Sequence, residues 1–440
     1  METTAESPYF LDATFTPADG RARCGMPFVC TARLLKDGQP ALGTILRCTV
    51  KWETEVVSVR DVVFDGNPVV VSYNSDKPGW LYICFQIVDA NGNIVQNPGH
   101  QIVQKRKQAA LLYEVGALFE ADRIIAKPSR PADFDAFWAG EKARLEALPM
   151  EAKLTPCAPL EGFAGKVELF SLEINCLGRY PVTGYLAIPV GAKPKSLPAC
   201  VEFLSHVWAD ASAITACTTA ATANALTAYI SWHGQPTGLP EKWYEEHQDD
   251  YYKPLEDIDK PTKWYFHDMY LRVLRALAYM KTRPEWNGKD LVIRGGSLAG
   301  IQAIAGAALD PDVTLALINA PTGCELNGPD SGRAPGWVFR KERVGNPLLH
   351  EPAVIQNNAY HDGVNLASLF HCETYLSIGL VDEVCFPSCV VAFFNALPDN
   401  IEKFLTTNPL TGHYGTTANP AAQARVAKGL NSVTISSNRD

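Results

Sequence analysis

A serine that follows two glycines is the sharpest chemical feature of this sequence. Residues 291–302 read LVIRGGSLAGIQ, so an apolar strand runs into the glycines, Ser297 and a helix of small residues. A serine in such a tight strand-to-helix turn has an exposed hydroxyl and a strained backbone, and the turn needs small residues two positions before and after it. Gly295 and Ala299 meet this need in the form G-x-S-x-A. The pattern predicts a nucleophilic serine, and taken alone it also fits a glycine-rich turn that binds phosphate.

A nucleophilic serine needs a base and an acid, and in this architecture they follow it in the chain order Ser, Asp, His. A carboxylate and an imidazole follow Ser297 in that order. Asp382 comes just after an apolar strand predicted at 373–378, and His413 lies in a glycine-flanked loop after a strand predicted at 401–406. Glu383 competes with Asp382 for the role of the acid, because position at a strand end separates neighbours only weakly. We expect Ser297, Asp382 and His413 to form a catalytic triad.

These residue types predict nucleophilic attack on an ester. His413 would accept the proton of the Ser297 hydroxyl, and Asp382 would hold the imidazole and stabilise its charged form. An acyl-serine forms, and water releases it. The charge on the carbonyl oxygen requires two backbone N–H donors. We expect one from Leu298, at the positive end of the following helix, and one from the loop after a strand that ends near Ser205.

From residue 131 onward strands and helices alternate, which indicates a mostly parallel sheet with helices on both faces. The order begins with a helix at 132–147 and an antiparallel strand pair at 167–174 and 180–188. It continues with strands at 199–205, 227–232, 291–294, 314–319, 373–378 and 401–406, and with helices that include 267–282. Ligands bind at the carboxyl ends of strands in such sheets, which is where the three candidate residues are expected.

The first 105 residues have a different pattern. Short alternating or apolar runs at 28–34, 44–55, 68–73 and 80–88 are separated by turn sequences, and no helical period joins them. This predicts a small all-β, immunoglobulin-like sandwich. We place the sandwich at 1–108, a linker at 109–131, the α/β domain at 132–432 with insertions near 236–263 and 322–371, and a flexible tail at 433–440.

Several segments within residues 128–425 together resemble the acetyl xylan esterase and cephalosporin C deacetylase family of α/β-hydrolases. They are RPADFDAFW at 130–138, GYLAIP at 184–189, GGS at 295–297, GLVD at 379–382 and GH at 412–413. The resemblance implies an α/β-hydrolase fold and the removal of acetyl groups from hydroxyls of sugars and other small alcohols. It also implies a Ser-Asp-His triad that works without a metal or other cofactor, and an acetylated sugar or oligosaccharide as the substrate.

The resemblance locates further candidate site residues. The sequence HGQ at 233–235 is similar to the family's Arg-Gly-Gln, and an ungapped count back from it places LSH at 204–206 in the oxyanion loop. The family usually has His-Gly-Tyr there, so the second oxyanion donor is expected to be the N–H of His206. Trp208, just after this loop, is a candidate for the acyl site, and Gln235 is a candidate for substrate binding.

Both insertions carry aromatic residues that suit a sugar. Trp243 lies among tyrosines and acidic residues in the segment 236–263, a composition that also fits a lid or an oligomer contact. Trp337 lies in the segment 322–371, which is the predicted cap over the pocket. We therefore expect both tryptophans to contact the substrate.

The composition excludes several partners. The 440 residues carry 39 basic and 48 acidic side chains, a net charge of −9, so neither nucleic acid nor an anionic membrane is an expected partner. No stretch is apolar enough to span a membrane. The 12 cysteines lack metal-ligand spacing, which favours buried free thiols and argues against zinc.

The location and the assembly of the protein stay open. The N-terminus lacks the features of a secretory signal, so the chain is either secreted or periplasmic with its signal removed, or cytoplasmic. A homo-oligomer is compatible with the sequence. The sandwich is expected to pack against the catalytic domain or to support assembly.

Three functions are compatible with these residues. The first is a serine esterase that removes acetyl groups from a carbohydrate. The second keeps the triad and changes the bond, as in peptidases, thioesterases and glucuronoyl esterases. The third is a carbohydrate-binding protein whose hydrolase site is vestigial, and an intact triad argues against it.

Overall fold

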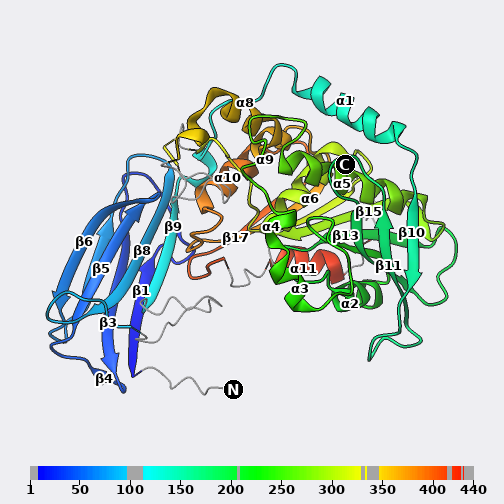
Figure 1. Ribbon diagram of the computed structural model, residues 1–440. Coiled ribbons are helices and arrows are strands. Elements are labelled where there is room, and N and C mark those ends of the chain that lie inside the picture. The colour runs from blue at the N-terminus through cyan, green and yellow to red at the C-terminus, as the bar shows by residue number, and fades with distance from the viewer. Residues whose placement is uncertain are drawn as a thin grey trace, which may run out of the picture.

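The structure is a computed structural model that describes residues 8–96, 112–205, 209–328, 332–333, 346–413, 419–427 and 430. Figure 1 shows two bodies side by side: a β-sandwich from the first part of the chain, in blue and cyan, and a larger α/β domain from the rest. This arrangement, a small all-β sandwich followed by an α/β domain, is the one that the sequence predicts.

The sandwich consists of two sheets that enclose one core. In the first sheet β3 (Phe28–Lys36) pairs with β1 (Tyr9–Thr16), β4 (Gln39–Pro40) and β7 (Val69–Tyr73). The second sheet has the order β2 (Arg21–Ala22), β9 (Tyr113–Phe119), β8 (Gly79–Val88), β5 (Ile45–Trp52) and β6 (Glu55–Val63). Every second side chain of β3 is fully buried, namely Phe28, Cys30, Ala32 and Leu34, as expected of a strand with one face on a core.

The linker predicted at 109–131 is wrong in its first part, because β9 lies within it. This strand pairs with β8 and all its side chains are buried. Its one charged residue, Glu114, accepts a hydrogen bond from the hydroxyl of Tyr82. The sandwich therefore extends to Phe119, and the connection to the α/β domain begins with a 3-10 helix at Ala121–Arg123. The basic residues that suggested a linker, at 105–107, and the predicted tail at 433–440 lie outside the described residues.

Within the described residues, the α/β domain is built on a sheet of nine strands in the order β10-β11-β12-β14-β13-β15-β16-β17-β18. Neighbours from β10 to β14 are antiparallel, and neighbours from β14 to β18 are parallel. The strands are β10 (Ala152–Pro156), β11 (Val167–Ile174), β12 (Val182–Pro189), β13 (Leu197–Phe203), β14 (Leu226–Ile230), β15 (Trp286–Gly296), β16 (Leu315–Asn319), β17 (Glu373–Gly379) and β18 (Lys403–Asn408). The carboxyl ends of the parallel strands meet at one edge of the sheet.

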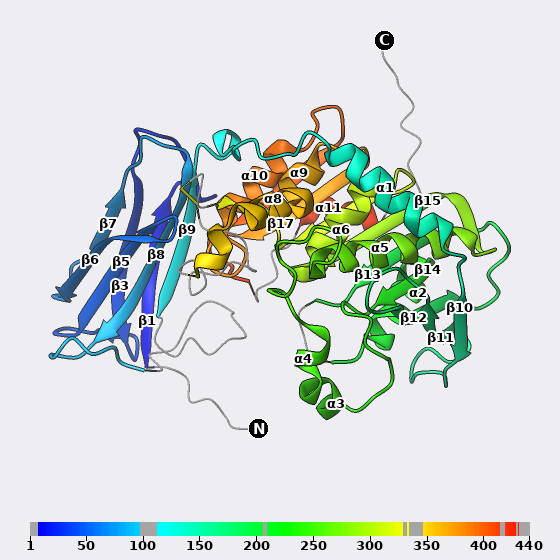
Figure 2. The same ribbon diagram turned by 45° about the horizontal axis from the view of Figure 1, so that its top comes forward.

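Helices cover both faces of this sheet (Figures 1 and 2). On one side lie α1 (Phe134–Ala147), α5 (Tyr265–Thr282), α6 (Leu298–Leu309), α9 (Gly363–Ala367) and α10 (Pro387–Ala396), and on the other α2 (Ala213–Ala223) and α11 (Pro420–Ala427). The short α3 (Glu241–Glu246) and α4 (Gln248–Tyr251) lie in the first insertion. Side chains of β15 alternate between the two faces of the sheet. Leu291 and Ile293 belong to the buried cluster that includes α5 and α6, and Val292 belongs to a smaller buried cluster against which α11 packs.

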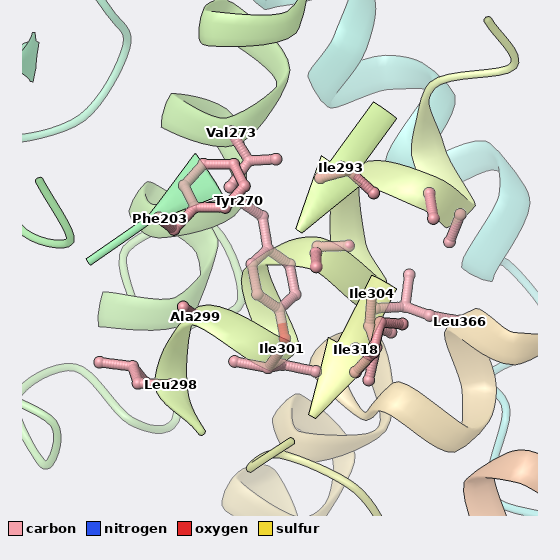
Figure 3. Close-up of a cluster of buried hydrophobic side chains, with 14 of the residues drawn as sticks. Phe203, Tyr270, Val273, Ile293, Leu298, Ala299, Ile301, Ile304, Ile318 and Leu366 are labelled. Carbon is pink, nitrogen blue, oxygen red and sulfur yellow. The ribbon is translucent and has the colours of Figure 1, made fainter. Parts of the chain in front are cut away.

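The core that positions the site lies between the sheet and the helices α5 and α6. Figure 3 shows Tyr270 and Val273 of α5 and Ile301 and Ile304 of α6 in one cluster with the strand residues Phe203, Ile293 and Ile318. Helix α6 has the sequence LAGIQAIAGAAL, and all twelve residues are buried. Its small side chains let the helix approach the sheet closely. Because α6 begins directly after Ser297, this packing fixes the backbone that carries the serine.

The cap predicted at 322–371 is wrong for the part that the structure describes at 346–371. Helix α8 (Pro352–His361) and α9 lie there, and Val354 and Leu366 are fully buried in the core of the α/β domain. Asp362 accepts three backbone N–H bonds that tie residues 325–326 to the start of α9. The segment is therefore part of the packed domain. Trp337 lies outside the described residues.

Two further findings concern function classes. In the part of the chain that is described, no helix has the length and apolar character needed to cross a membrane. In the same residues, His, Cys, Asp and Glu side chains form no group of three that could hold a metal ion. All twelve cysteines lie in described segments, none of them forms a disulfide bond, and most are buried. Burial raises the pKa of Cys30 to about 12 and that of Cys48 to about 11, so both stay protonated at neutral pH.

Candidate active site

Ser297 occupies the strand-to-helix turn between β15 and α6. Its backbone has φ 56° and ψ −121°, a conformation that costs a residue other than glycine about 1–3 kcal/mol. The turn is held by the Ser297 N–H, which donates to Asn319 O over 3.0 Å, and by the Ser297 carbonyl, which accepts from Gly300 N–H over 2.9 Å. A Cβ on Gly295 would lie 2.0 Å from the carbonyl oxygen of Ala299. Only glycine fits there, which explains the first position of the G-x-S-x-A pattern.

His413 lies within hydrogen-bond reach of both other candidates. Its Nε2 is 3.0 Å from Ser297 Oγ, and its Nδ1 is 2.9 Å from Oδ2 of Asp382. With the carboxylate ionised, Nδ1 carries the proton and Nε2 accepts the hydrogen bond of the hydroxyl. The side chain of His413 is 10% exposed, whereas that of Asp382 is fully buried. The structure therefore brings together the three residues that the sequence singled out.

Backbone groups hold the buried carboxylate of Asp382. Its Oδ1 accepts hydrogen bonds from the N–H groups of Val384 and Cys385, over 2.8 and 2.9 Å. Such bonds stabilise a carboxylate that has no contact with bulk water. Glu383, the competing acid, instead forms an ion pair with Lys51 of the sandwich. Of the two neighbours, it is Asp382 that contacts the imidazole.

Three parallel strands place these side chains at one edge of the sheet. Ser297 follows β15, Asp382 follows β17 and His413 follows β18. Gly379, the last residue of β17, allows the acid loop and the imidazole loop to meet, because a Cβ there would lie 1.9 Å from the carbonyl oxygen of Thr411. This close approach is the physical reason for the glycine in the GLVD segment.

The first of the two predicted oxyanion donors can be placed. Leu298 is buried and supplies the first backbone N–H of α6. The first four N–H groups of a helix have no partner within the helix, and the helix dipole makes this end positive. The turn therefore offers a donor directly beside the serine. The second predicted donor, His206, and the neighbouring Trp208 lie outside the described residues.

The remaining candidate substrate residues differ in exposure. Gln235 is fully buried, and its side-chain amide has no hydrogen-bond partner in the described part of the chain. A shielded side chain does not meet a substrate in this conformation, so contact by Gln235 stays a prediction. Trp243 in α3 is only partly buried; its ring stacks on that of His247 at 4.3 Å and meets the edge of Tyr251 at 6.1 Å. It can present an aromatic surface.

The chain is similar to known proteins along its α/β domain. Residues 120–425 match the family model described as acetyl xylan esterase (AXE1). The chain is 27% identical over 335 residues to acetyl esterase Axe7A of Xylanibacter ruminicola, and the aligned region covers 73% of this chain and 72% of that protein. An acetyl xylan esterase structure from Paenibacillus sp. R4 matches with a TM-score of 0.59 and 23% identity, over 70% of this chain and 98% of that one. Another, from Thermoanaerobacterium sp. JW/SL YS485, has a TM-score of 0.59 and 18% identity over 71% and 98%. Both structures share the fold.

Proposed function

This chain belongs to the acetyl xylan esterase (AXE1) family, and on that premise we propose that Ser297, His413 and Asp382 are its catalytic residues. It is a carboxylic ester hydrolase that removes acetyl groups from carbohydrate. The observation that carries the proposal is the continuous hydrogen-bond chain, 3.0 Å from hydroxyl to imidazole and 2.9 Å from imidazole to a buried carboxylate.

In the first half of the proposed reaction, Ser297 Oγ attacks the acetyl carbonyl carbon while His413 Nε2 takes the proton of the serine hydroxyl. The imidazolium then faces the carboxylate of Asp382, which stabilises the new charge. His413 returns the proton to the oxygen of the departing sugar hydroxyl, and an acetyl-serine remains. In the second half, the same imidazole deprotonates a water molecule that attacks this ester, acetate leaves, and Ser297 regains its proton.

Two N–H donors would stabilise the oxyanion that forms in each half. We assign one to Leu298, whose place at the start of α6 supports it, and the other to His206, as the family resemblance implies. Removal of a single oxyanion donor typically costs about 2.7–4 kcal/mol of transition-state stabilisation.

We further propose an acetylated xylan-type oligosaccharide as the substrate. The printed names of the relatives support it, since one is an acetyl esterase and two are acetyl xylan esterases. The partly exposed Trp243, packed with His247 and Tyr251, supports a place where an aromatic face meets a sugar ring. Trp208, Gln235 and Trp337 remain further predicted contacts.

The test is acetate release from acetylated xylo-oligosaccharides by the wild type and by Ser297→Ala. We expect the wild type to release acetate and the variant to be at least about 10,000-fold slower, because removal of the nucleophile disables the whole triad. Wild-type turnover by the variant would disprove the serine mechanism. A parallel panel of a glucuronoyl ester, a thioester and a peptide tests the other bonds, and sugar binding without turnover of any ester would indicate a non-catalytic protein.

A further inference from the structure

The outer face of the sandwich is buried against the α/β domain. Trp80, Tyr82 and Cys84 of β8 and Leu118 of β9 belong to the same buried cluster as the core of the α/β domain, and not to the core of the sandwich. Figures 1 and 2 show β9, in cyan, on the side of the sandwich that faces the orange segments around β17 and α10. These segments include the loop that carries the proposed catalytic acid.

Trp80 contacts the loop of Asp382 directly. Its indole N–H donates to the carbonyl oxygen of Leu380 over 2.7 Å, and its ring lies 5.7 Å from that of Phe386. Trp80 has no exposed surface, so water does not compete for this hydrogen bond. Leu380 comes two residues before Asp382, so the bond holds the backbone from which the carboxylate projects.

Two ionisable residues of the sandwich, Lys51 and Glu53, contact the part of the chain that follows the acid. Lys51 forms an ion pair of 2.5 Å with Glu383, the residue directly after the acid. Glu53 accepts a hydrogen bond of 2.6 Å from the hydroxyl of Ser388 in the first turn of α10, and another of 2.9 Å from the backbone N–H of Trp80. The loop between β17 and α10 is thus held on both sides of the acid.

Strand β9 contacts the backbone that leads to His413. The N–H of Gly116 donates to the carbonyl oxygen of Pro409 over 2.8 Å. A Cβ on Gly116 would lie 1.9 Å from the carbonyl oxygen of Leu380, so the strand also touches the acid loop. The N–H of Leu380 in turn donates to Asn408 O over 2.7 Å. The sandwich therefore contacts the two catalytic loops at the point where they contact each other.

We propose that the sandwich positions the catalytic acid and base: Trp80, Glu53 and Gly116 hold the two loops so that the imidazole meets Ser297. This inference rests on the proposed function of the triad. Catalytic groups must be held within about 0.5 Å of their productive geometry, and a misplacement of 1 Å caused by a distant mutation can cost about 100-fold in rate. The three residues are positioning residues, since none of them touches the reacting atoms.

The experiment compares Trp80→Phe with Trp138→Phe in the full chain. Trp138 is equally buried and donates its indole N–H to Tyr360 O over 2.9 Å, so its replacement removes the same kind of bond away from both loops. With p-nitrophenyl acetate we expect Trp80→Phe to lower kcat about 10-fold with little change in KM, because the loop carrying the acid shifts. We expect both variants to lower the Tm by similar amounts, because each loses one buried hydrogen bond. We expect Trp138→Phe to keep the wild-type kcat.

A second pair of variants tests the backbone contact. Gly116→Ala forces its methyl group against Leu380 O, whereas Gly140→Ala adds a methyl group with nothing within 4 Å. We expect only Gly116→Ala to lower kcat and to slow the inactivation of Ser297 by a sulfonyl fluoride. If Gly116→Ala fails to fold, Trp80→Phe decides, since it keeps an aromatic ring in place.

The outcomes separate this inference from the proposed function. Wild-type kcat in folded Trp80→Phe, or an equal loss of kcat in Trp138→Phe, overturns the positioning role while Ser297→Ala stays inactive. An active Ser297→Ala overturns the triad itself.

Discussion

The carboxylate of Asp382 has two oxygens with different partners. Oδ1 accepts two backbone N–H bonds within its own loop, and Oδ2 faces Nδ1 of His413. One oxygen therefore fixes the side chain, and the other is left to orient the imidazole. The backbone donors replace the hydrogen bonds to water that burial removes, so the fully buried carboxylate keeps partners on both oxygens.

Asp382→Asn is the prediction that follows at this scale. The amide keeps the shape of the carboxylate but cannot stabilise the imidazolium, and it favours the wrong tautomer of His413. We expect kcat to fall about 10,000-fold with p-nitrophenyl acetate, with an unchanged fold by circular dichroism. Glu383→Gln is the matched control: it removes the ion pair with Lys51, and we expect a loss of only a few-fold. A larger loss from Glu383→Gln than from Asp382→Asn would show that the wrong acid has been assigned.

The element that presents the proposed nucleophile, Ser297, is the β15-turn-α6 unit. Helix α6 lies so close to its neighbours that a Cβ on Gly300 would be 2.7 Å from the backbone Cα of Pro321. Helix α6 contains two internal glycines, Gly300 and Gly306, although glycine is a poor helix former. Because Gly300 has no side chain, the first turn of the helix lies close to Pro321. The turn before the helix is held at the same place, where the Ser297 N–H donates to Asn319 at the end of β16.

Replacing glycine by alanine in two helices should have opposite effects on stability. Gly300→Ala gains helix propensity but forces the rigid Pro321 to move, and we expect a net loss of about 1–3 kcal/mol in the free energy of unfolding. Gly140 in α1 is exposed with nothing within 4 Å of its Cβ position, and we expect Gly140→Ala to gain about 0.5–1 kcal/mol. Urea denaturation of both variants measures these values. A gain in both would mean that α6 can move away from Pro321 without cost.

How much could be predicted from the sequence differs between elements. Ser297, Asp382 and His413 each follow an apolar strand, and this local signal predicts their places at one sheet edge. Strand β6 is not predicted by the sequence, because its five valines do not alternate regularly with polar residues, and nearly all its side chains are exposed. Strand β9 is the opposite case: it is buried throughout, so it lacks the alternation of a sandwich strand, and its sequence does not distinguish it from a linker.

At the scale of the whole molecule, the contacts that join the two domains have no local signal at all. The hydrogen bond from Trp80 to Leu380 joins residues 300 positions apart, and that from Ser388 to Glu53 joins residues 335 apart. The sequence predicted that the sandwich packs or assembles, but no pattern near Trp80 or Glu53 indicates a partner in the acid loop. Such contacts depend on how two complete domains meet.

The same interface predicts a dependence of stability on pH. Burial raises the pKa of Glu53 to about 7, although the hydrogen bonds from Ser388 and Trp80 and the charge of Arg333 oppose this and Glu325 adds to it. The folded protein therefore holds the Glu53 proton more tightly than the unfolded chain, whose ordinary value is 4.5. The stability from this group is fully present below about pH 4.5 and is lost as the pH rises through about 7, a change of about 3 kcal/mol.

Glu53→Gln should remove this contribution. The amide can still accept the N–H bond of Trp80 and bond to Ser388, but it carries no charge to bury at high pH. We expect the variant to match the wild type near pH 4 and to exceed its stability near pH 8 in urea denaturation. Other buried acids, such as Asp362, are common to both proteins and cancel in the difference.

Glu55→Gln, which removes an exposed carboxylate two residues away, should show the same difference from the wild type at both pH values. If Glu53→Gln behaves in that way too, then Glu53 is charged at the interface throughout, and Lys51 and Arg333 must compensate it.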